Sequence, residues 1–541
     1  MSFFQLPFTP RYILLTLALV LTAMLLGDVI LRPGNHPIVF GMLALAAIFS
    51  AIGLRDISQT RHSILRNYPI AAHLRFLFEE IRPEMRQYFF EGDRDGAPFS
   101  RDQRAIVYQR SKMVLDQRPF GTQADVYADN FEWLNHSMAP KPVAKKGFRI
   151  RIGGPQCARP YDASVFNISA MSFGALSANA IRALSTGAKA GGFAQDTGEG
   201  GLSPYHEAGG GDIIWEVGSG YFGCRTADGA FSPERFSEVA SRDQVKMVEL
   251  KLSQGAKPGH GGVLPAAKVS AEIARIRGVP GGKDCISPAR HSVFTTPIEL
   301  VQFIDRMRTL SGGKPAGFKL CIGQPHEFLA ICKAMLATGL APDFIVVDGK
   351  EGGTGAAPQE FIDHLGMPMR EGLNFVHNAL VGVGLRERIH VGVAGKIVTA
   401  IDMARAFALG ADWCNAARGF MFAIGCIQSQ ICHTDRCPVG VATQDPSRQR
   451  GLVVPDKATR VANFHSATLK SLAEVVAAVG LEHPSDFRPE HVSRRISPSG
   501  IKSFAELYPA LRPGELIAGT EDPRFKAAWA SARAETFEMG T

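Results

Sequence analysis

From about residue 160 the sequence repeats one pattern, in which a short apolar run is followed by a glycine-rich loop and then by helical spacing. Six such runs cover residues 165–168, 248–252, 317–321, 344–348, 390–393 and 412–415. Strands that alternate with helices form a parallel sheet, because a parallel connection needs a long crossover. The number of units in about 280 residues favours a closed (β/α)8 TIM-type barrel over an open doubly wound sheet. The predicted fold class is therefore α/β.

The composition excludes several classes of protein. Of the 541 residues 45% are apolar and 20% are charged, which excludes general disorder. Nine cysteines are too dilute for a disulfide scaffold and no cleavable signal sequence is apparent, so we expect a reducing compartment. The net charge is +8, and residues 1–160 hold 20 Lys and Arg against 13 Asp and Glu. No nucleic-acid motif accompanies this charge, so no nucleic-acid partner is predicted.

Two apolar runs near the N-terminus are each long enough to cross a bilayer. Residues 12–31 contain Asp28 as their only charge, residues 37–54 contain none, and about 20 apolar residues span ~30 Å of hydrocarbon. Residues 32–36 predict a tight turn between them, so residues 1–54 are expected to form a transmembrane helical hairpin. The alternative is a signal peptide followed by a buried core helix.

Arginines flank this hairpin unequally. Arg11 precedes it and Arg55, Arg61 and Arg66 follow it, whereas the connecting turn has only Arg32. The positive-inside rule then places both ends in the cytoplasm. We therefore expect the chain at the inner (cytoplasmic) membrane, with its catalytic domain in the cytoplasm. The remaining expected regions are a helical N-terminal region at 55–158, the barrel at 159–450 and a C-terminal helical extension packed on the barrel at 451–541.

Two late loops of the predicted barrel suit a phosphate group. Gly395 follows one strand and residues 416–419 follow the next, where barrels commonly bind phosphate through backbone N–H groups. Lys396 and Arg418 add positive charge to these loops. The glycines of residues 352–358 allow backbone to approach a planar ring closely. Together the loops favour a flavin nucleotide over glycines that only make tight turns.

Three of the cysteines are clustered. Cys426, Cys432 and Cys437 lie within 12 positions, and a proline follows the last, as in many iron–sulfur sequences. Three thiolates alone suit a 3Fe-4S cluster. A zinc site would need a fourth ligand, and His433 is awkwardly placed beside Cys432 to bind the same ion. Plain core cysteines are the remaining alternative, and the other six are most simply buried hydrophobes.

The sequence resembles the flavin- and iron–sulfur-containing synthase domain of glutamate synthase, specifically its short, membrane-anchored relatives. The motifs that carry this resemblance are SAMSFGALS (169–177), TGEGG (197–201), QGAKPGHGG (254–262), ISP (286–288), GGTGA (352–356) and the cysteine segment 426–446. The resemblance implies FMN and a 3Fe-4S cluster as cofactors. It implies that electrons reach FMN by way of the cluster, and that the reduced flavin gives a hydride to 2-iminoglutarate, formed from 2-oxoglutarate and ammonia.

The resemblance also implies roles for individual residues. Those expected beside the flavin ring or hydrogen-bonded to its pyrimidine side are Ala170, Met171, Ser172, Gln254 and Lys319. Those expected around its phosphate are Gly353, Gly355, Gly395 and Ala417. The catalytic residues expected to bind the keto acid are Glu199, Lys257 and Arg277. The expected cluster ligands are Cys426, Cys432 and Cys437.

The sequence departs from the family near the keto-acid site and in its partners. Val263 stands where glutamate synthases have Gln, and His260 replaces an acidic residue. No dinucleotide-binding GxGxxG follows a strand, so we expect a separate electron-donor protein or subunit, besides a small 2-oxo acid or amino acid. No cysteine-nucleophile domain precedes the barrel, so this chain is not expected to release ammonia from glutamine. A second hypothesis is a membrane-anchored electron-relay protein without its own substrate, and either type of protein is compatible with an oligomer.

Overall fold

The computed structural model describes residues 7–32, 34 and 37–540. The chain divides into two compact units, residues 1–98 and 99–541. This division falls inside residues 55–158, which were expected to form one helical N-terminal region.

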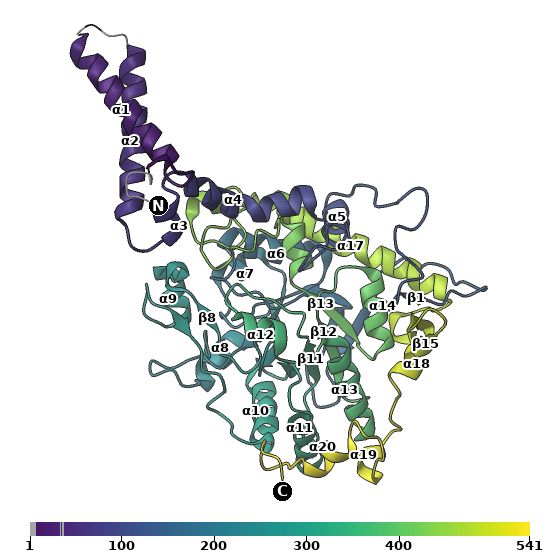
Figure 1. Cartoon of the computed structure of the whole chain (residues 1–541). Coiled ribbons are helices and arrows are strands. Elements are labelled where there is room, and N and C mark those ends of the chain that lie inside the picture. The colour runs from purple at the N-terminus through teal and green to yellow at the C-terminus, as the bar shows by residue number, and fades with distance from the viewer. Residues whose placement is uncertain (1–6, 33, 35–36, 541) are drawn as a thin grey trace. The chain divides into compact units, whose positions relative to one another are not determined.

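The first unit contains the two apolar helices, α1 (Ile13–Leu31) and α2 (Pro37–Ser58), which pack side by side (Figure 1). Thr22 and Ser50 join them through hydroxyl oxygens 3.0 Å apart. Both helices are long and apolar enough to cross a membrane, and only 11% and 17% of their most apolar stretches are buried. A core helix would be mostly buried, so the core-helix alternative does not describe α2. Residues 33, 35 and 36 of the predicted turn lie outside the described residues.

Three short helical segments complete this unit: α3 (Ser63–Asn67), α4 (Ala71–Met85) and the π-helix η2 (Arg86–Phe90). The buried carboxylate of Asp56 accepts a hydrogen bond from the Ile70 backbone N–H at 2.9 Å and contacts His73 Nε2 at 2.9 Å. This contact fixes the start of α4 against the end of α2. Helix α4 agrees with the helical N-terminal region expected at 55–158.

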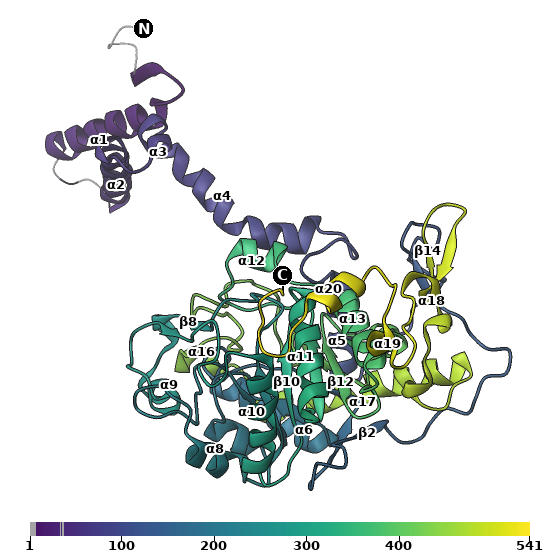
Figure 2. The same cartoon turned by 90° about the horizontal axis from the view of Figure 1, so that it is seen from below.

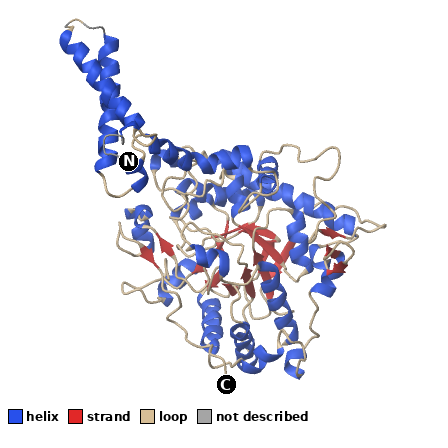
Figure 3. Ribbon diagram, in the orientation of Figure 1, coloured by secondary structure: helices blue, strands red, loops and turns tan. Residues whose placement is uncertain are grey.

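Eight parallel strands close into a barrel in the second unit (Figure 3). They are β4 (Phe166–Ile168), β5 (Ala194–Asp196), β6 (Asp212–Val217), β7 (Val245–Lys251), β10 (Ala316–Leu320), β11 (Phe344–Asp348), β12 (His390–Ala394) and β13 (Trp413–Ala416). The last strand pairs with the first, with Cys414 opposite Phe166. The predicted (β/α)8 barrel is confirmed, and all six predicted apolar runs are strands. The strands β5 and β6 were not predicted.

Helices surround these strands, as the view from below shows (Figure 2). In chain order they are α6 (Ala178–Gly191), α7 (Pro204–Gly209), α8 (Pro233–Ala240), α10 (Pro297–Leu310), α11 (Pro325–Thr338), α12 (Gln359–His364), α13 (Met369–Gly382), α14 (Ala400–Ala408) and α17 (Val454–Val479). Several start at Ser or Thr caps; for example, the Ser177 hydroxyl accepts from the Ala180 N–H and Thr399 from the Asp402 N–H. Each cap fixes where a strand loop turns into its helix.

A hairpin closes the lower end of the barrel. Its strands are β2 (Arg149–Ile152) and β3 (Tyr161–Ser164). Ile152, Tyr161 and Ala163 pack against an apolar layer inside the barrel, formed by Ala194, Ile214, Met247, Phe344, Val346 and Trp413. This end is therefore filled by side chains, and the loops at the opposite end remain free to form a site.

Further elements lie outside the eight repeats. Between β7 and α10 lie β8 (Val263–Leu264), η3 (Ala266–Lys268), α9 (Ala271–Arg277) and β9 (Cys285–Ile286), and after β13 come α15 (Arg418–Ala423) and α16 (Pro446–Gln449). Helix α5 (Arg101–Ser111) packs on α17. The chain ends with η4 (Pro484–Asp486), η5 (Pro489–His491), α18 (Phe504–Leu507), α19 (Glu515–Ala518) and α20 (Lys526–Ser531).

The segment 451–541 is not only helical, because it also contributes two strands to an antiparallel sheet. Strands β14 (Val492–Arg495) and β15 (Ile501–Ser503) extend β1 (Glu132–Leu134). The almost buried carboxylate of Glu132 explains this pairing, since it forms ion pairs with three guanidinium groups, those of Arg370, Arg405 and Arg494. The ion pairs tie β1 to the barrel helices α13 and α14 as well as to β14.

A buried ion pair beneath the barrel predicts a large effect on stability. Asp343 is fully buried and accepts from Arg308 Nε at 2.8 Å, whereas Asp305, on the same guanidinium, has a side chain that is 40% exposed. Asp343→Ala should cost about 3–5 kcal/mol, because a buried cation loses its partner. Asp305→Ala should cost about 1 kcal/mol or less. Thermal unfolding of the two variants measures this difference, and equal midpoints would contradict it.

Candidate functional site

A cavity of about 250 Å³ lies among the loops at the carboxyl ends of the barrel strands. Every residue that the resemblance assigned to the flavin or the keto acid lines this one cavity: Ala170, Met171, Ser172, Glu199, Gln254, Lys257, Arg277, Lys319, Gly353, Gly355, Gly395 and Ala417. Of the three clustered cysteines Cys432 lines it, and Cys426 and Cys437 do not. Barrel closure thus brings together residues that are far apart in the sequence.

The loop after β4 is held by neighbours from two other loops. The Ser172 hydroxyl accepts from the Gly200 backbone N–H at 3.2 Å. The Gln444 side chain donates to the carbonyls of Gly174 and Leu176, at 3.0 and 2.9 Å. The loop carrying residues 170–172 is therefore fixed on one side by the loop after β5 and on the other by the segment that follows the cysteines.

A close backbone approach positions Gln254 and Lys257. The N–H of Gly255 donates to Asp348 Oδ2 at 3.0 Å. A Cβ at residue 255 would lie 1.7 Å from the Gly349 carbonyl oxygen, so only glycine fits there. The loop after β7 thus lies directly against the glycine loop after β11.

Two cations face the cavity without a carboxylate partner. Lys257 is 2% exposed and Arg277 is 4% exposed, and neither forms an ion pair within the described part of the chain. Lys257 Nζ donates to the Gly261 carbonyl at 2.8 Å, and Arg277 Nη2 donates to the Phe173 carbonyl at 3.0 Å. Arg277 Nε has no hydrogen-bond partner among the described residues. Buried unpaired charge is costly, so these two groups are suited to bind an anion.

Glu199 lies beside these cations and is ionised. Its carboxylate pairs with Lys251 Nζ at 2.9 Å. Burial opposes its charge, but Lys251, Arg277 and Lys257 together hold the pKa of Glu199 below its usual value. Burial lowers the pKa of Lys257 to about 8, against the opposing effect of Glu199. A Cβ at residue 262 would lie 2.1 Å from Glu199 Oε1, so Gly262 makes room for this carboxylate.

A second pair of cations lies at the far side of the cavity. Arg418 is half-buried and Lys396 is exposed, and each lies within 6 Å of the Phe99 ring centre, at 5.9 and 5.8 Å. Neither forms an ion pair with any carboxylate that the structure describes. The Arg418 guanidinium lies against Gly353, where a Cβ would be only 1.6 Å from Nη2. This end can therefore hold another anionic group.

The three clustered thiols lie on the loop that follows α15. Cys437 is buried, and Cys426 and Cys432 are partly buried. Burial raises the pKa of Cys426 to about 11, and the two other thiols act in the same direction. In the described residues the only three ligand-type groups that all lie within 4.8 Å of one another are carboxylates, so at least two of the three Sγ atoms are more than 4.8 Å apart. Lys268 and Arg418 oppose the rise in the pKa of Cys432.

Several residues of the cavity were not predicted from the sequence. Lys251, Lys268, Glu216, Asp348 and Asn415 line it as well. Glu216 lies in β6 and Lys251 lies at the end of β7, and both side chains line the cavity inside the barrel. A charged residue at an inward position of an otherwise apolar strand is the signal that would have identified them.

Comparison with known proteins agrees with these motifs. The family model described as "Conserved region in glutamate synthase" matches residues 156–482. The glutamate synthase large subunit-like protein YerD of Bacillus subtilis is 39% identical over 511 residues, which cover 87% of this chain and 97% of YerD. The archaeal glutamate synthase (NADPH) of Methanocaldococcus jannaschii is 36% identical over 362 residues, 66% of each chain.

A longer relative matches over a smaller share of its length. The glutamate synthase (NADPH) large chain of Bacillus subtilis is 33% identical over 330 residues, 59% of this chain and 20% of the relative. The chain therefore spans nearly all of YerD but less than two thirds of the other two proteins. Because the family model covers more than half of the chain and YerD aligns over almost its full length, this chain belongs to the glutamate synthase family of oxidoreductases.

Proposed function

We propose that the protein is an FMN- and 3Fe-4S-dependent oxidoreductase that performs reductive amination of a 2-oxo acid, 2-oxoglutarate to glutamate or a closely related reaction. The observation that carries this proposal is the pair of buried, unpaired cations, Lys257 and Arg277, next to the ionised Glu199. A 2-oxo dicarboxylic acid offers two carboxylates to such cations. An iminium N–H needs an acceptor, which the Glu199 carboxylate provides.

The residues around the cavity fit FMN. Arg418 and Lys396 supply two unpaired positive charges for its phosphate, next to the backbone of Gly353 and Gly395. Lys319 and Gln254 supply donors for the pyrimidine side, where a cation stabilises the anionic reduced ring. Asn415 Oδ1 is buried, has no hydrogen-bond partner in the part of the chain that the structure describes, and can accept from a ring N–H. When bound, the flavin supplies the hydride.

The cysteine loop fits a cluster of several irons better than one zinc ion. Zinc–sulfur bonds of about 2.3 Å require all three thiolates to lie within about 4.6 Å of one another, whereas at least one pair of the three Sγ atoms is more than 4.8 Å apart. A thiolate-bound cluster is anionic, and Lys268 and Arg418 lie where their charges act on Cys432. When bound, the cluster passes electrons singly. These features support the assignment of Cys426, Cys432 and Cys437 as its ligands.

The residues of the chain itself bind and orient the keto acid. Lys257 and Arg277 hold its carboxylates, while Lys251 keeps Glu199 ionised, so that Glu199 accepts a proton or hydrogen bond rather than donating one. Val263 also lines the cavity, in place of the Gln of glutamate synthases. This position offers no polar contact, so the preferred substrate can be less polar than 2-oxoglutarate. The same observation favours the second candidate, a flavin and iron–sulfur electron-relay protein that has lost its substrate.

Substrate chemistry predicts a charge-dependent response of the flavin. Lys257→Met and Arg277→Ala should weaken apparent substrate affinity roughly tenfold to a hundredfold, since a charge-assisted contact is worth about 1.5–3 kcal/mol. Flavin content should not change. In the parent protein, affinity should also fall as pH rises above about 8, where Lys257 loses its proton, and Lys257→Met should abolish that dependence. The readout is reoxidation of the reduced flavin absorbance by 2-oxoglutarate plus ammonium.

The control for these variants is Lys189→Met, which removes an exposed lysine of α6. It should respond like the parent protein. If the Lys257 and Arg277 variants match the parent with every 2-oxo acid and amino acid that it responds to, the catalytic assignment fails and the electron-relay function is favoured.

The cluster assignment predicts a selective loss of iron. Cys432→Ser should remove iron and acid-labile sulfide while most FMN remains, because the cysteine loop follows the phosphate-binding residues without containing them. The parent protein should hold about three irons per chain, as a 3Fe-4S cluster requires. Cys157→Ser is the matched control, since Ser keeps the contact of Cys157 with the Gly313 carbonyl. Zinc in the parent protein, or unchanged iron in Cys432→Ser, would overturn the assignment.

We also propose that α1 and α2 cross the cytoplasmic membrane as a hairpin, with both of its ends in the cytoplasm. The full-length chain should then stay in the membrane fraction after an alkaline carbonate wash. A chain that begins just before Phe99 should be soluble and keep its flavin, because the barrel unit starts there. Cell fractionation and flavin absorbance test both statements. Full-length protein that is soluble without detergent would contradict the membrane insertion.

A further inference from the structure

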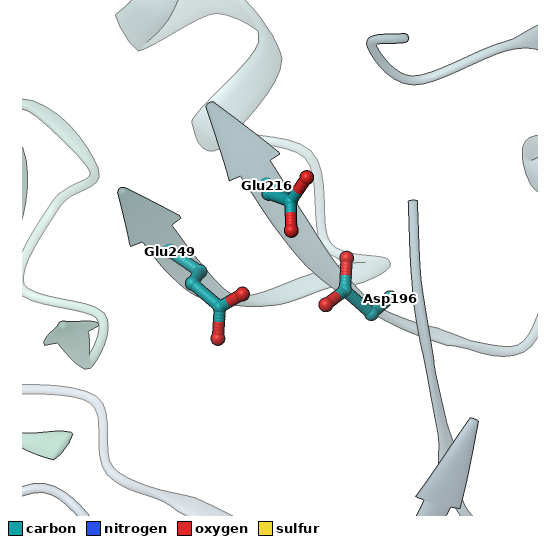
Figure 4. Close-up of side chains that lie close together, drawn as sticks. All are labelled: Asp196, Glu216 and Glu249. Carbon is teal, nitrogen blue, oxygen red and sulfur yellow. The ribbon is translucent and has the colours of Figure 1, made fainter. Parts of the chain in front are cut away.

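The barrel interior carries charged side chains directly below the cavity, where barrels usually carry apolar ones. Asp196, Glu216 and Glu249 project inward from the neighbouring strands β5, β6 and β7 (Figure 4). Their carboxylate oxygens lie within 4.8 Å of one another, and all three residues are 1% exposed. We call these three residues the acid layer.

Among the described residues one cation, Lys319, contacts the acid layer. Lys319 of β10 is 3% exposed, forms an ion pair with Glu216 and lies 3.6 Å from Glu249 Oε1. Lys319 and Glu216 also line the cavity, whereas Asp196 and Glu249 do not. The ammonium group of Lys319 therefore lies between the cavity above and the rest of the acid layer below.

The acid layer cannot be fully ionised. Three carboxylates and one ammonium would leave two uncompensated negative charges out of water, and like charges this close do not ionise together. Neither oxygen of Glu249 accepts a hydrogen bond from an N–H or hydroxyl group of the described residues, which would be costly for a carboxylate. At least one proton is therefore bound within the layer.

The acids of the layer differ in the pH at which they lose their protons. Burial and then the charge of Asp196 raise the pKa of Glu249 well above its usual value, against the opposing effect of Lys319, and this rise favours the neutral form of Glu249. Burial and then Glu216 raise the pKa of Asp196 to about 7, against the opposing effect of Lys319. The charged groups facing Asp196 are thus Glu216 and Lys319, the titratable Glu249 also contacts it, and Asp348 of β11 acts on Glu249. Asp196 is the member that changes its charge near neutral pH.

We propose that the acid layer is a proton-binding site that takes up one proton from water when the cofactor above Lys319 gains negative charge. This inference rests on the proposed binding of FMN. Two electrons from the external donor and one proton convert the cofactor to its anionic reduced form. The new negative charge then shares the Lys319 ammonium with Glu216, and the Asp196 carboxylate takes up a second proton. Two electrons are thus accompanied by two protons, one on the cofactor and one on Asp196.

The pH dependence of the flavin potential in the full-length protein tests this proposal. For each proton taken up with two electrons, the equilibrium constant for flavin reduction changes tenfold per pH unit, which lowers the reduction potential by about 30 mV per pH unit. Between about pH 7.5 and 9 the parent protein should show a hundredfold change per pH unit, about 60 mV. Below about pH 6 Asp196 is already protonated before reduction, so the equilibrium constant should change only tenfold per pH unit. Spectroelectrochemical titration at the flavin absorbance measures these values.

In the variant Asp196→Asn the equilibrium constant for flavin reduction should change tenfold per pH unit over the whole pH range. Asn keeps the oxygen that accepts from the Gly198 N–H at 2.9 Å, so the loop that follows β5 is preserved. Glu238→Gln removes an exposed carboxylate of α8 and should behave like the parent protein. A tenfold dependence of the parent at every pH would overturn the proposal, as would a hundredfold dependence retained in Asp196→Asn.

A second measurement does not depend on flavin. Infrared spectra at about pH 9, where Asp196 is ionised, should show the carbonyl band of a protonated, buried carboxylic acid, and Glu249→Gln should remove it. If the parent protein lacks this band, the acid layer holds no proton and the proposal fails, even if FMN and substrate bind as proposed. Presence of the band in a protein that binds no flavin would instead overturn the proposed cofactor and leave the proton site in place.

Discussion

Pairing of the last barrel strand with the first is the interaction on which the site depends. The register that sets Cys414 opposite Phe166 continues upward into the hydrogen bond from the Ser169 N–H to the Ala416 carbonyl, at 3.1 Å. Residue 417 thereby lies beside residues 170–172, although about 250 positions separate them in the chain. Without this closure the motif after β4 and the cysteine loop after β13 would face solvent separately. With it they bound one cavity.

The sign of the charged side chains changes along the barrel axis, from the closed end to the cavity. The lowest layer is apolar and is covered by the β2–β3 hairpin. Above it the carboxylates outnumber the cations, and at the level of the cavity the cations Lys257 and Arg277 lack carboxylate partners. Excess negative charge thus lies beneath Lys319 and excess positive charge lies around the space for an anionic ligand. A proton below and an anion above would each offset the cost of the uncompensated charge.

The sequence was informative where strands are apolar and loops are rich in glycine. Six strands and all the residues assigned to the cavity could be placed from these patterns and from the resemblance. Strand β5 has only three residues, Ala-Gln-Asp, and α7 after it has only six, so neither β5 nor the following strand stood out as a repeat. The acid layer was missed for the same reason, because Asp196 and Glu216 lie on these two strands. The strands β14 and β15 depend on the distant Glu132, which no local pattern reveals.

The barrel unit begins at a residue that belongs to the cavity, which limits how far this unit can be shortened from its N-terminal end. Phe99 is buried, lines the cavity and exchanges two backbone hydrogen bonds with the Gln428 side chain, at 3.1 and 3.0 Å. Gln428 itself lies two positions after the first clustered cysteine, and its N–H approaches Cys426 Sγ at 3.5 Å. Phe99, the first residue of the unit, thus lines the cavity and also holds the cysteine loop in place through Gln428. A chain cut even a few residues inside this border would open the site from the side, although every barrel strand would remain.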